Sequence, residues 1–258
     1  MKVLMLHGFL GDRSDWTDFV AAARIALPDL EADTPDLPGH GHRPEPVPED
    51  FAGWVAWVRG RLDAAGGPVH LLGYSMGGRL ALAAAVAEAG TDRVASLAVL
   101  AASPGIVDAT ARAERRRVDA ERADRLQRDG LTAFLEQWYG MPLFQPAIEL
   151  VGLELLVARR SRGQAHALAA ALITAGAGMM PDLRPRLERL AIPVLAIAGD
   201  RDSRYMNLEQ DIAALAPAGQ FAVVPGAGHA LLVEAPERCA AFWRAFVLSA
   251  NLAEGASP

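Results

Sequence analysis

Cysteine and long apolar runs are the scarcest features of this sequence. Cys239 is the single cysteine among 258 residues, which excludes an internal disulfide framework and a cysteine-rich metal site. The longest apolar stretches fall far short of the roughly 18 residues that a membrane span needs. The apolar start at residues 1–6 is too short for a secretory signal. We therefore expect a cytoplasmic protein with no membrane span and no metal site.

Positive charge is also in the minority. The sequence has 25 Lys+Arg against 31 Asp+Glu, a formal net charge of −6, and Lys2 is its only lysine. No global positive field is available to attract nucleic acid or an anionic membrane surface. Because 52% of the residues are hydrophobic and 22% are charged, the composition excludes a disordered chain. The length suits a single α/β unit.

Short apolar runs alternate with segments of helical periodicity along most of the chain. Strands are predicted at residues 3–6, 30–34, 69–72, 94–100, 194–198 and 221–224. Helices are predicted at residues 14–26, 49–64, 76–89, 207–215 and 236–249, with Ser14 as the N-cap of the first. Uninterrupted apolar strands that alternate with helices indicate a parallel sheet covered on both faces.

One region breaks this alternation. Residues 105–186 contain no convincing strand and have the pattern of several successive helices, so we expect an inserted helical cap on a core formed by residues 1–104 and 187–258. The charged run at residues 111–122 is typical of a solvated helix face.

A G-x-S-x-G element follows the predicted strand at residues 69–72 and opens an alanine-rich helix. This context predicts a nucleophile elbow with Ser75 as the nucleophile. The turn imposes strained backbone angles on the serine, so small neighbours are required, and Gly73, Gly77 and Gly78 supply the clearance. Ser75 would then lie at the N-terminus of a helix, where the helix dipole favours negative charge.

A serine nucleophile or base needs a histidine and an acid, and in this architecture they follow in the order serine, acid, histidine. His229 follows the last predicted strand, at the edge of the sheet where α/β active sites lie. The other histidines fall in a strand, in the cap or in turns rich in Gly and Pro: His70, His166, His7, His40 and His42. His229 is therefore the predicted base.

Two aspartates follow the strand at residues 194–198. We favour Asp202 as the acid, because it lies further past the strand end than Asp200 and is better placed to reach the histidine. Asp200 is the alternative and is otherwise expected to be a turn residue.

A glycine-rich loop after the first strand supplies the remaining part of such a site. The backbone N–H groups of Phe9 and Met76 would form an oxyanion hole. His7 and Gly8 are expected to shape this loop, and residues 36–41 are expected to form a structural turn at the rim of the site.

Together these elements resemble the α/β-hydrolase superfamily over essentially the whole chain. The resemblance implies an α/β-hydrolase fold of about six mostly parallel strands with an inserted helical cap. The sequence begins at the strand before the loop of residues 7–11 and shows no counterpart of the two antiparallel edge strands that many members carry before it.

Several segments resemble one branch, the 2-succinyl-6-hydroxy-2,4-cyclohexadiene-1-carboxylate (SHCHC) synthases of menaquinone biosynthesis. These segments are residues 6–11, 73–79, 103–105, 112–117, 134–139, 142–144, 181–184 and 199–203. The resemblance implies a lyase that needs no cofactor. It eliminates pyruvate from 2-succinyl-5-enolpyruvyl-6-hydroxy-3-cyclohexene-1-carboxylate, with the triad as general base. That substrate carries three carboxylates, which guanidinium groups bind well.

By motif position, the resemblance implies five substrate-binding residues: Tyr74, Arg79, Arg115, Trp138 and Arg160. Arg116 or Arg117 could replace Arg115 in this role, and Arg159 could replace Arg160. The implied partner is a small polycarboxylate, while the oligomeric state stays open.

Two departures from the branch leave room for other functions. Met179 and Met180 stand where the family commonly has Gln, and residues 228–234 lack the second histidine of some members. A carboxylesterase or C–C bond hydrolase that forms an acyl-enzyme on Ser75 is the main alternative. The pocket arginines argue against it. A non-enzymatic small-molecule receptor would need a disabled triad or oxyanion loop, and the sequence has neither.

Overall fold

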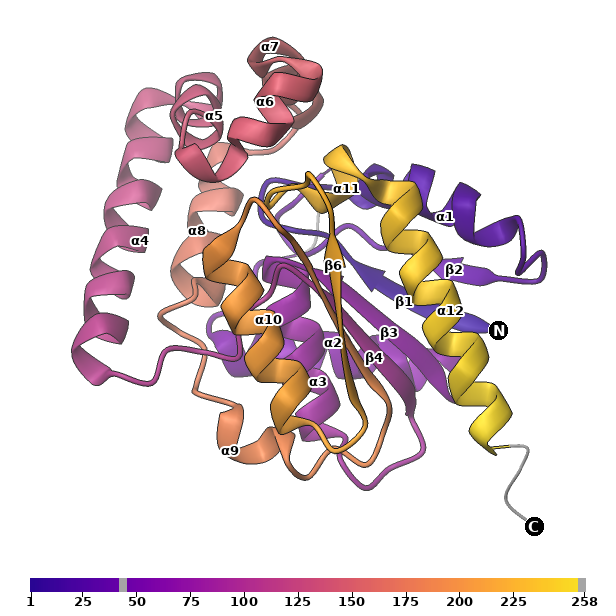
Figure 1. Cartoon of the computed structure of the whole chain (residues 1–258). Coiled ribbons are helices and arrows are strands. Elements are labelled where there is room, and N and C mark those ends of the chain that lie inside the picture. The colour runs from indigo at the N-terminus through magenta and orange to yellow at the C-terminus, as the bar shows by residue number, and fades with distance from the viewer. Residues whose placement is uncertain (42–45, 255–258) are drawn as a thin grey trace.

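Six parallel strands form one sheet at the centre of the molecule, as the computed structural model shows for residues 1–41 and 46–254 (Figure 1). The strands are β1 (Lys2–Leu6), β2 (Glu31–Asp33), β3 (Val69–Tyr74), β4 (Val94–Leu100), β5 (Val194–Gly199) and β6 (Gly219–Val224). Their order in the sheet is β2-β1-β3-β4-β5-β6, and every pairing is parallel. The six strands predicted from the sequence and the α/β-hydrolase fold are both confirmed.

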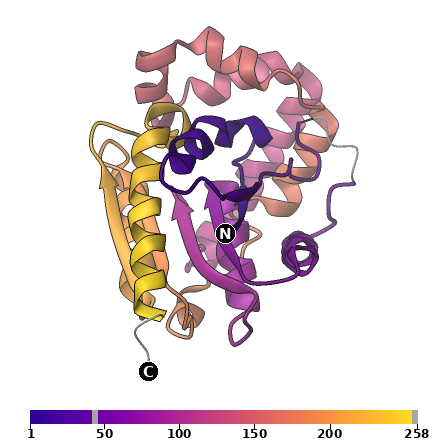
Figure 2. The ribbon, with the colours of Figure 1, turned by 90° about the vertical axis from the view of Figure 1, so that its right-hand side faces the viewer.

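Helices cover both faces of the sheet. On one face lie α1 (Thr17–Arg24) and α12 (Pro236–Glu254), and on the other α2 (Phe51–Ala65), α3 (Met76–Ala87) and α10 (Ser203–Leu215) (Figures 1 and 2). Alternate side chains of β1 enter the two layers, since Leu4 packs with α2 and α3 while Met5 packs with α1 and α12. The strands are apolar throughout because both of their faces are buried.

The starts of α1 and α10 differ by several residues from the sequence prediction, in both cases because an aspartate caps the segment. Asp12, not Ser14, accepts the capping hydrogen bond, from the backbone N–H of Ser14 at 2.8 Å. It starts a 3₁₀ turn, η1 (Arg13–Trp16), before α1. Asp202 likewise caps α10 by accepting from Tyr205 N at 3.2 Å, so that helix begins several residues earlier than predicted.

Between β4 and β5 the chain forms a group of helices, here called the cap helices. They are α4 (Ala109–Asp129), α5 (Leu131–Tyr139), the 3₁₀ turn η2 (Pro142–Phe144), α6 (Gln145–Val151), α7 (Leu153–Arg160) and α8 (Ala165–Ala175). Their apolar core includes Leu10 and Ala230, which follow β1 and β6. The cap helices therefore lie over the carboxyl ends of the strands (Figure 1).

The chain enters and leaves the cap helices at neighbouring points. Leu183 N donates to Pro104 O at 2.8 Å, so the two connecting segments lie side by side. The short helices α9 (Arg184–Leu187) and α11 (Leu231–Glu234) follow the cap helices and β6, respectively. No helix in the described part of the chain is long and apolar enough to cross a membrane.

Candidate active site

Ser75 lies on the sharp turn between β3 and α3. Its φ of 50° is in the left-handed region, which costs backbone strain in a residue with a side chain. The turn closes because the glycines around it have no side chain: a Cβ on Gly73 would lie 2.3 Å from Gly77 O, and one on Gly77 would lie 2.2 Å from Leu6 O. This tight packing positions the serine hydroxyl above the carboxyl end of the sheet.

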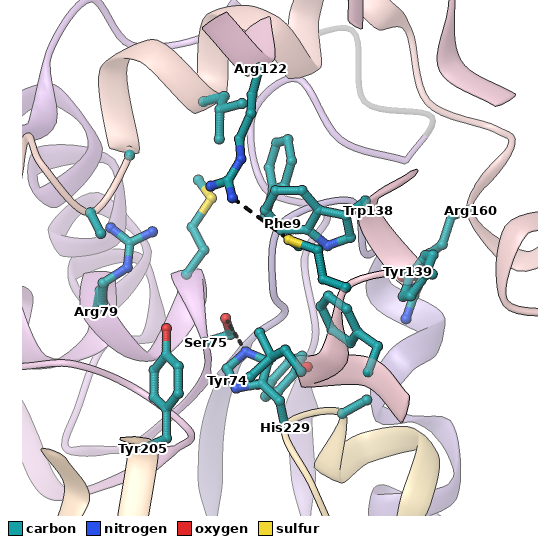
Figure 3. A pocket seen from close by; sticks show the side chains of 18 of the residues that line it. Phe9, Tyr74, Ser75, Arg79, Arg122, Trp138, Tyr139, Arg160, Tyr205 and His229 are labelled. Carbon is teal, nitrogen blue, oxygen red and sulfur yellow. Dashed lines mark hydrogen bonds between the residues drawn. The ribbon is translucent and has the colours of Figure 1, made fainter. Parts of the chain in front are cut away.

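His229 and Asp202 complete a hydrogen-bonded chain with this serine. Ser75 Oγ lies 3.1 Å from His229 Nε2 (Figure 3), and His229 Nδ1 lies 3.0 Å from Asp202 Oδ2. A carboxylate can only accept, so Nδ1 donates to Asp202 and Nε2 is left to accept from the serine. The imidazole and the carboxylate are both buried, which excludes water from their hydrogen bond.

The two aspartates after β5 have different partners. Asp202 uses one oxygen for His229 and the other for the N-terminus of α10. Asp200 accepts from Gly226 N at 2.7 Å and is exposed, so it holds the turn after β6. The geometry favours Asp202 over Asp200 as the histidine's partner.

Phe9 and Met76, whose backbone N–H groups are the predicted oxyanion hole, both line the cavity above Ser75. Met76 N is at the start of α3, where the first amides have no partner within the helix, and Phe9 is in the loop after β1. Neither amide donates to a backbone carbonyl in the described ranges. Gly77 N donates to His7 O at 3.1 Å, which ties the β1 loop to the serine turn.

A cavity of about 330 Å³ opens above the serine, between the strand ends and the cap helices. Its lining includes six aromatic side chains: Phe9, Tyr74, Trp138, Tyr139, Phe144 and Tyr205. The Trp138 ring lies 5.2 Å from the Phe9 ring, and the Tyr205 ring lies 4.4 Å from the imidazole of His229. Of the predicted site residues all but Asp202, which lies behind His229, line this cavity.

The three predicted arginines reach the cavity with different partners. Arg160 pairs with the buried Asp15 and donates to Tyr139 Oη at 3.1 Å. Arg115 donates from Nε to both oxygens of Asp119 at 2.9 Å. Arg79 donates only to the Ala175 carbonyl oxygen, at 2.7 Å, and pairs with no carboxylate in the described residues. Its burial and the nearby charge of Arg115 lower the pKa of Arg79 to about 10.

The alternatives considered for the two cap arginines are not among the cavity's lining residues. Arg117 is exposed and pairs with Glu114 and Glu121 on the outer side of α4. Arg116 donates to Gly178 O at 3.3 Å, and Arg159 is exposed.

Comparisons with known proteins identify the family of this chain. Residues 3–242 match the family described as Alpha/beta hydrolase family. The chain is 33% identical over 233 residues to the 2-succinyl-6-hydroxy-2,4-cyclohexadiene-1-carboxylate synthase of Salmonella typhimurium, an alignment that covers 88% of this chain and 86% of that protein. The chain belongs to this synthase family of α/β hydrolases.

Solved structures show the same relationship. The structure of MenH from S. aureus superposes with a TM-score of 0.89 at 30% identity, covering 97% of this chain and 94% of that one. A thermophilic esterase from Thermogutta terrifontis, in its malate-bound structure, gives a TM-score of 0.78 at 26% identity, covering 97% and 90%. The fold of this synthase family is therefore shared with esterases.

The structure also brings residues to the cavity of this family member that the sequence did not single out: Asp15, Arg122, Arg204 and Tyr205. Arg122 was assigned to a solvated helix face, yet it is at position i+7 from Arg115, which places both on one side of α4. Arg204 and Tyr205 lie two and three residues after Asp202, so their place at the cavity could have been inferred from that of the acid.

Glu234 is a further residue that the sequence analysis missed. Its carboxylate accepts from Gly228 N and from Ala230 N, the amides on either side of His229, the second at 3.0 Å. Burial raises the pKa of this carboxyl group. Glu234 thereby fixes the loop that carries the histidine.

The remaining histidines have structural surroundings. His7 accepts from Leu37 N at 2.9 Å, and burial lowers its pKa to about 4. His40 is buried beside it, His70 lies in β3, and His166 is exposed. His42 lies outside the described residues. The described residues contain no group of three or more His, Cys, Asp or Glu side chains that could hold a metal ion.

Proposed function

We propose that this protein is a lyase that eliminates pyruvate from 2-succinyl-5-enolpyruvyl-6-hydroxy-3-cyclohexene-1-carboxylate and releases SHCHC. Membership of the synthase family supports the reaction class. The observation that carries the proposal for this chain is the excess of positive charge in a cavity that opens onto the hydrogen-bonded Ser75, His229 and Asp202.

The charge of the cavity suits a substrate with three carboxylates. Five arginines line it: Arg79, Arg115, Arg122, Arg160 and Arg204. Two carboxylates pair with members of this set, Asp15 with Arg160 and Asp119 with Arg115. The five arginines therefore exceed the two carboxylates by three positive charges, because Asp119 contacts both Arg115 and Arg122. A neutral ester would leave this excess charge unpaired, which disfavours its binding in a partly desolvated site.

In the proposed mechanism the triad acts as a base. Asp202 orients His229 and stabilises its charged form, and His229 takes the proton of Ser75 as the serine oxygen removes a proton from the substrate ring. The amides of Phe9 and Met76 stabilise the negative charge that builds on the succinyl carbonyl. The ring C–O bond then breaks, enolpyruvate leaves as its enolate, and protonation of the enolate at its methylene carbon, with the proton held by His229, gives pyruvate and restores the triad. No bond forms between Ser75 and the substrate.

Within this proposal, residues 105–186 form the cap and residues 1–104 and 187–258 form the catalytic core. The hydrogen bond between Leu183 and Pro104 supports that division, because it closes the base of the insertion. Tyr74 and Trp138 would contact the substrate from the core and from the cap, respectively. A cytoplasmic location is also proposed. Fractionation of cells that express the protein tests it.

The deciding experiment measures pyruvate release from the synthesised substrate beside hydrolysis of p-nitrophenyl esters. We expect pyruvate release to exceed ester turnover and to fall by several orders of magnitude in Ser75→Ala and in His229→Ala, with little further loss in the double variant. Ser103→Ala is a matched control, since this buried serine hydrogen-bonds only within its own turn at Gly105. Near-native pyruvate release in Ser75→Ala would refute the triad.

Carboxylester hydrolysis is the second candidate function. It is favoured by the 26% identity to the T. terrifontis esterase and by a serine and histidine at a distance suited to acyl-enzyme formation. Rapid ester turnover without pyruvate release in the wild type would establish it in place of the lyase.

A further inference from the structure

Arg122 is held at the cavity by unusually weak partners. Its guanidinium carbon lies 5.3 Å from the centre of the Trp138 ring, and Nη2 donates to Met141 Sδ at 3.6 Å. The remaining contact, from Nη1 to Asp119 Oδ1, is long at 3.4 Å. An aromatic face and a thioether orient a guanidinium without satisfying its strong donors.

Among the described residues, the one carboxylate that Arg122 contacts, Asp119, is already engaged. Both oxygens of Asp119 accept from Arg115 Nε at 2.9 Å, and the Asp119 side chain is only 3% exposed. Arg122 is thus the second cation beside a single anion. Burial and the charge of Arg115 lower its pKa, as expected when a guanidinium lacks a full counter-charge.

The position of Arg122 also separates it from the other cations of the cavity. Figure 3 shows Arg122 above the cavity and across from Ser75, with Arg79 on one side and Arg160 on the other. Arg160 is neutralised by Asp15, whereas Arg122 and Arg79 are not neutralised by a carboxylate of their own. An anion between the cap helices and the serine would therefore meet Arg122 on its cap side.

We propose that Arg122 is a substrate-binding residue, which holds a carboxylate at the cap side of the cavity while Trp138 fixes the plane of its guanidinium. The ligand class is a small polycarboxylate, so this inference rests on the proposed function for the identity of the natural ligand. The guanidinium fork would form charge-assisted hydrogen bonds with that carboxylate.

The experiment measures the dissociation constant of succinate by calorimetry, in a buffer free of carboxylates. The proteins are wild type, Arg122→Met, Arg122→Lys and Arg128→Met. Methionine keeps an unbranched apolar stem without the charge, and lysine keeps the charge but loses the fork. Arg128 is the matched control, because it is an exposed arginine at the end of the same helix and pairs with Asp129.

We expect Arg122→Met to weaken succinate binding about tenfold or more, since hydrogen bonds between charged groups contribute about 1.5–3 kcal/mol, each 1.4 kcal/mol being tenfold. Arg122→Lys should retain part of the affinity, and Arg128→Met should stay within twofold of wild type. In the pyruvate-release assay, Arg122→Met should raise KM with kcat changed less than threefold.

Succinate affinity within twofold of wild type in Arg122→Met would overturn the assignment, as would an equal loss in Arg128→Met. The proposed function fails separately. A wild type that binds succinate through Arg122 but releases no pyruvate would refute the lyase and leave this binding site. If the wild type releases pyruvate but its succinate affinity does not depend on Arg122, the lyase is supported and the role of Arg122 is refuted.

Discussion

Arg79, which has no carboxylate partner in the described residues, and Arg160, which is paired with Asp15, should respond differently to replacement. Both side chains are largely buried at the cavity, but Arg79 donates a single hydrogen bond to a carbonyl, while Arg160 forms an ion pair with Asp15. Each substitution to methionine removes one positive charge. Arg79→Met should lower activity with little change in the free energy of unfolding, whereas Arg160→Met should lower the free energy of unfolding.

The magnitude for Arg79 follows from its electrostatic surroundings. Its pKa is lowered from 12.5 to about 10, and at about 1.36 kcal/mol per pKa unit the charged form costs the folded protein roughly 3 kcal/mol. This cost is fully present at neutral pH and disappears only as the pH rises above about 10. Arg79→Met removes the cost together with one charge-assisted hydrogen bond of about 1.5–3 kcal/mol. We expect the free energy of unfolding to stay within about 1.5 kcal/mol of wild type.

Arg160→Met leaves the buried carboxylate of Asp15 without its partner. Breaking such a pair typically destabilises a protein by about 3–5 kcal/mol. Urea unfolding of both variants and of Arg160→Met combined with Asp15→Asn measures the difference. The double variant should regain part of the loss, because its neutral amide no longer needs a buried counter-charge.

Activity supplies the second half of this test. If Arg79 binds a substrate carboxylate, its loss costs roughly 2–5 kcal/mol in transition-state binding, which lowers kcat/KM for pyruvate release about thirtyfold or more. Hydrolysis of a neutral p-nitrophenyl ester should change little. The reasoning is refuted if Arg79→Met loses more than about 3 kcal/mol of unfolding free energy, or if both activities fall equally, since either result would assign Arg79 a structural role.

Three further outcomes test other parts of the site. Asp202→Asn should lower kcat by about three orders of magnitude or more, whereas Asp200→Asn should change kcat little. If steady-state kinetics show the reverse order, Asp200 and not Asp202 is the acid. Glu234→Gln should lower kcat more than it raises KM, because the loop that carries His229 loses one charged acceptor, and steady-state kinetics check this. Burial lowers the pKa of His40 to about 3, so the unfolded chain binds the proton first and stability falls as the pH decreases below about 6.5. Between pH 7 and 5, urea unfolding should show a loss about 2 kcal/mol smaller in His40→Gln than in wild type.

The sequence predicted the sheet and the serine, histidine and aspartate because each is encoded locally. Uninterrupted apolar runs identify buried parallel strands, and glycines at fixed offsets from Ser75 identify a turn that tolerates no side chain there. The helix starts were less accurate, since Ser14 and Asp12 are both good caps and only the folded loop determines which side chain accepts.

The charge partners in the cavity were much harder to predict. Asp15 and Arg160 are 145 residues apart in the sequence, and no local pattern connects them. The charged run of α4 contains Arg122, but it does not show which arginines face the cavity, because its charged residues lie on both the solvated side and the cavity side of the helix. Arg117 forms ion pairs on the solvated side, as the sequence suggested, while Arg122 lines the cavity. The periodicity of the helix separates the two sides only once one cavity residue is known.

Under the proposed function, the arginines decide which chemistry the serine performs. The same Ser75 and His229 would form an acyl-enzyme if a carbonyl carbon lay at the serine oxygen, and would remove a proton if a ring C–H bond lay there. The triad geometry does not distinguish these reactions, because both begin with proton transfer from the serine to the histidine. The difference must come from groups that fix the substrate away from the reacting atoms. Arg79 and Arg122 line different parts of the cavity above Ser75 (Figure 3). Each has few hydrogen-bond acceptors within the protein. Carboxylates bound to both would fix the ring between them, so selectivity for elimination would arise from substrate orientation rather than from a change in the nucleophile.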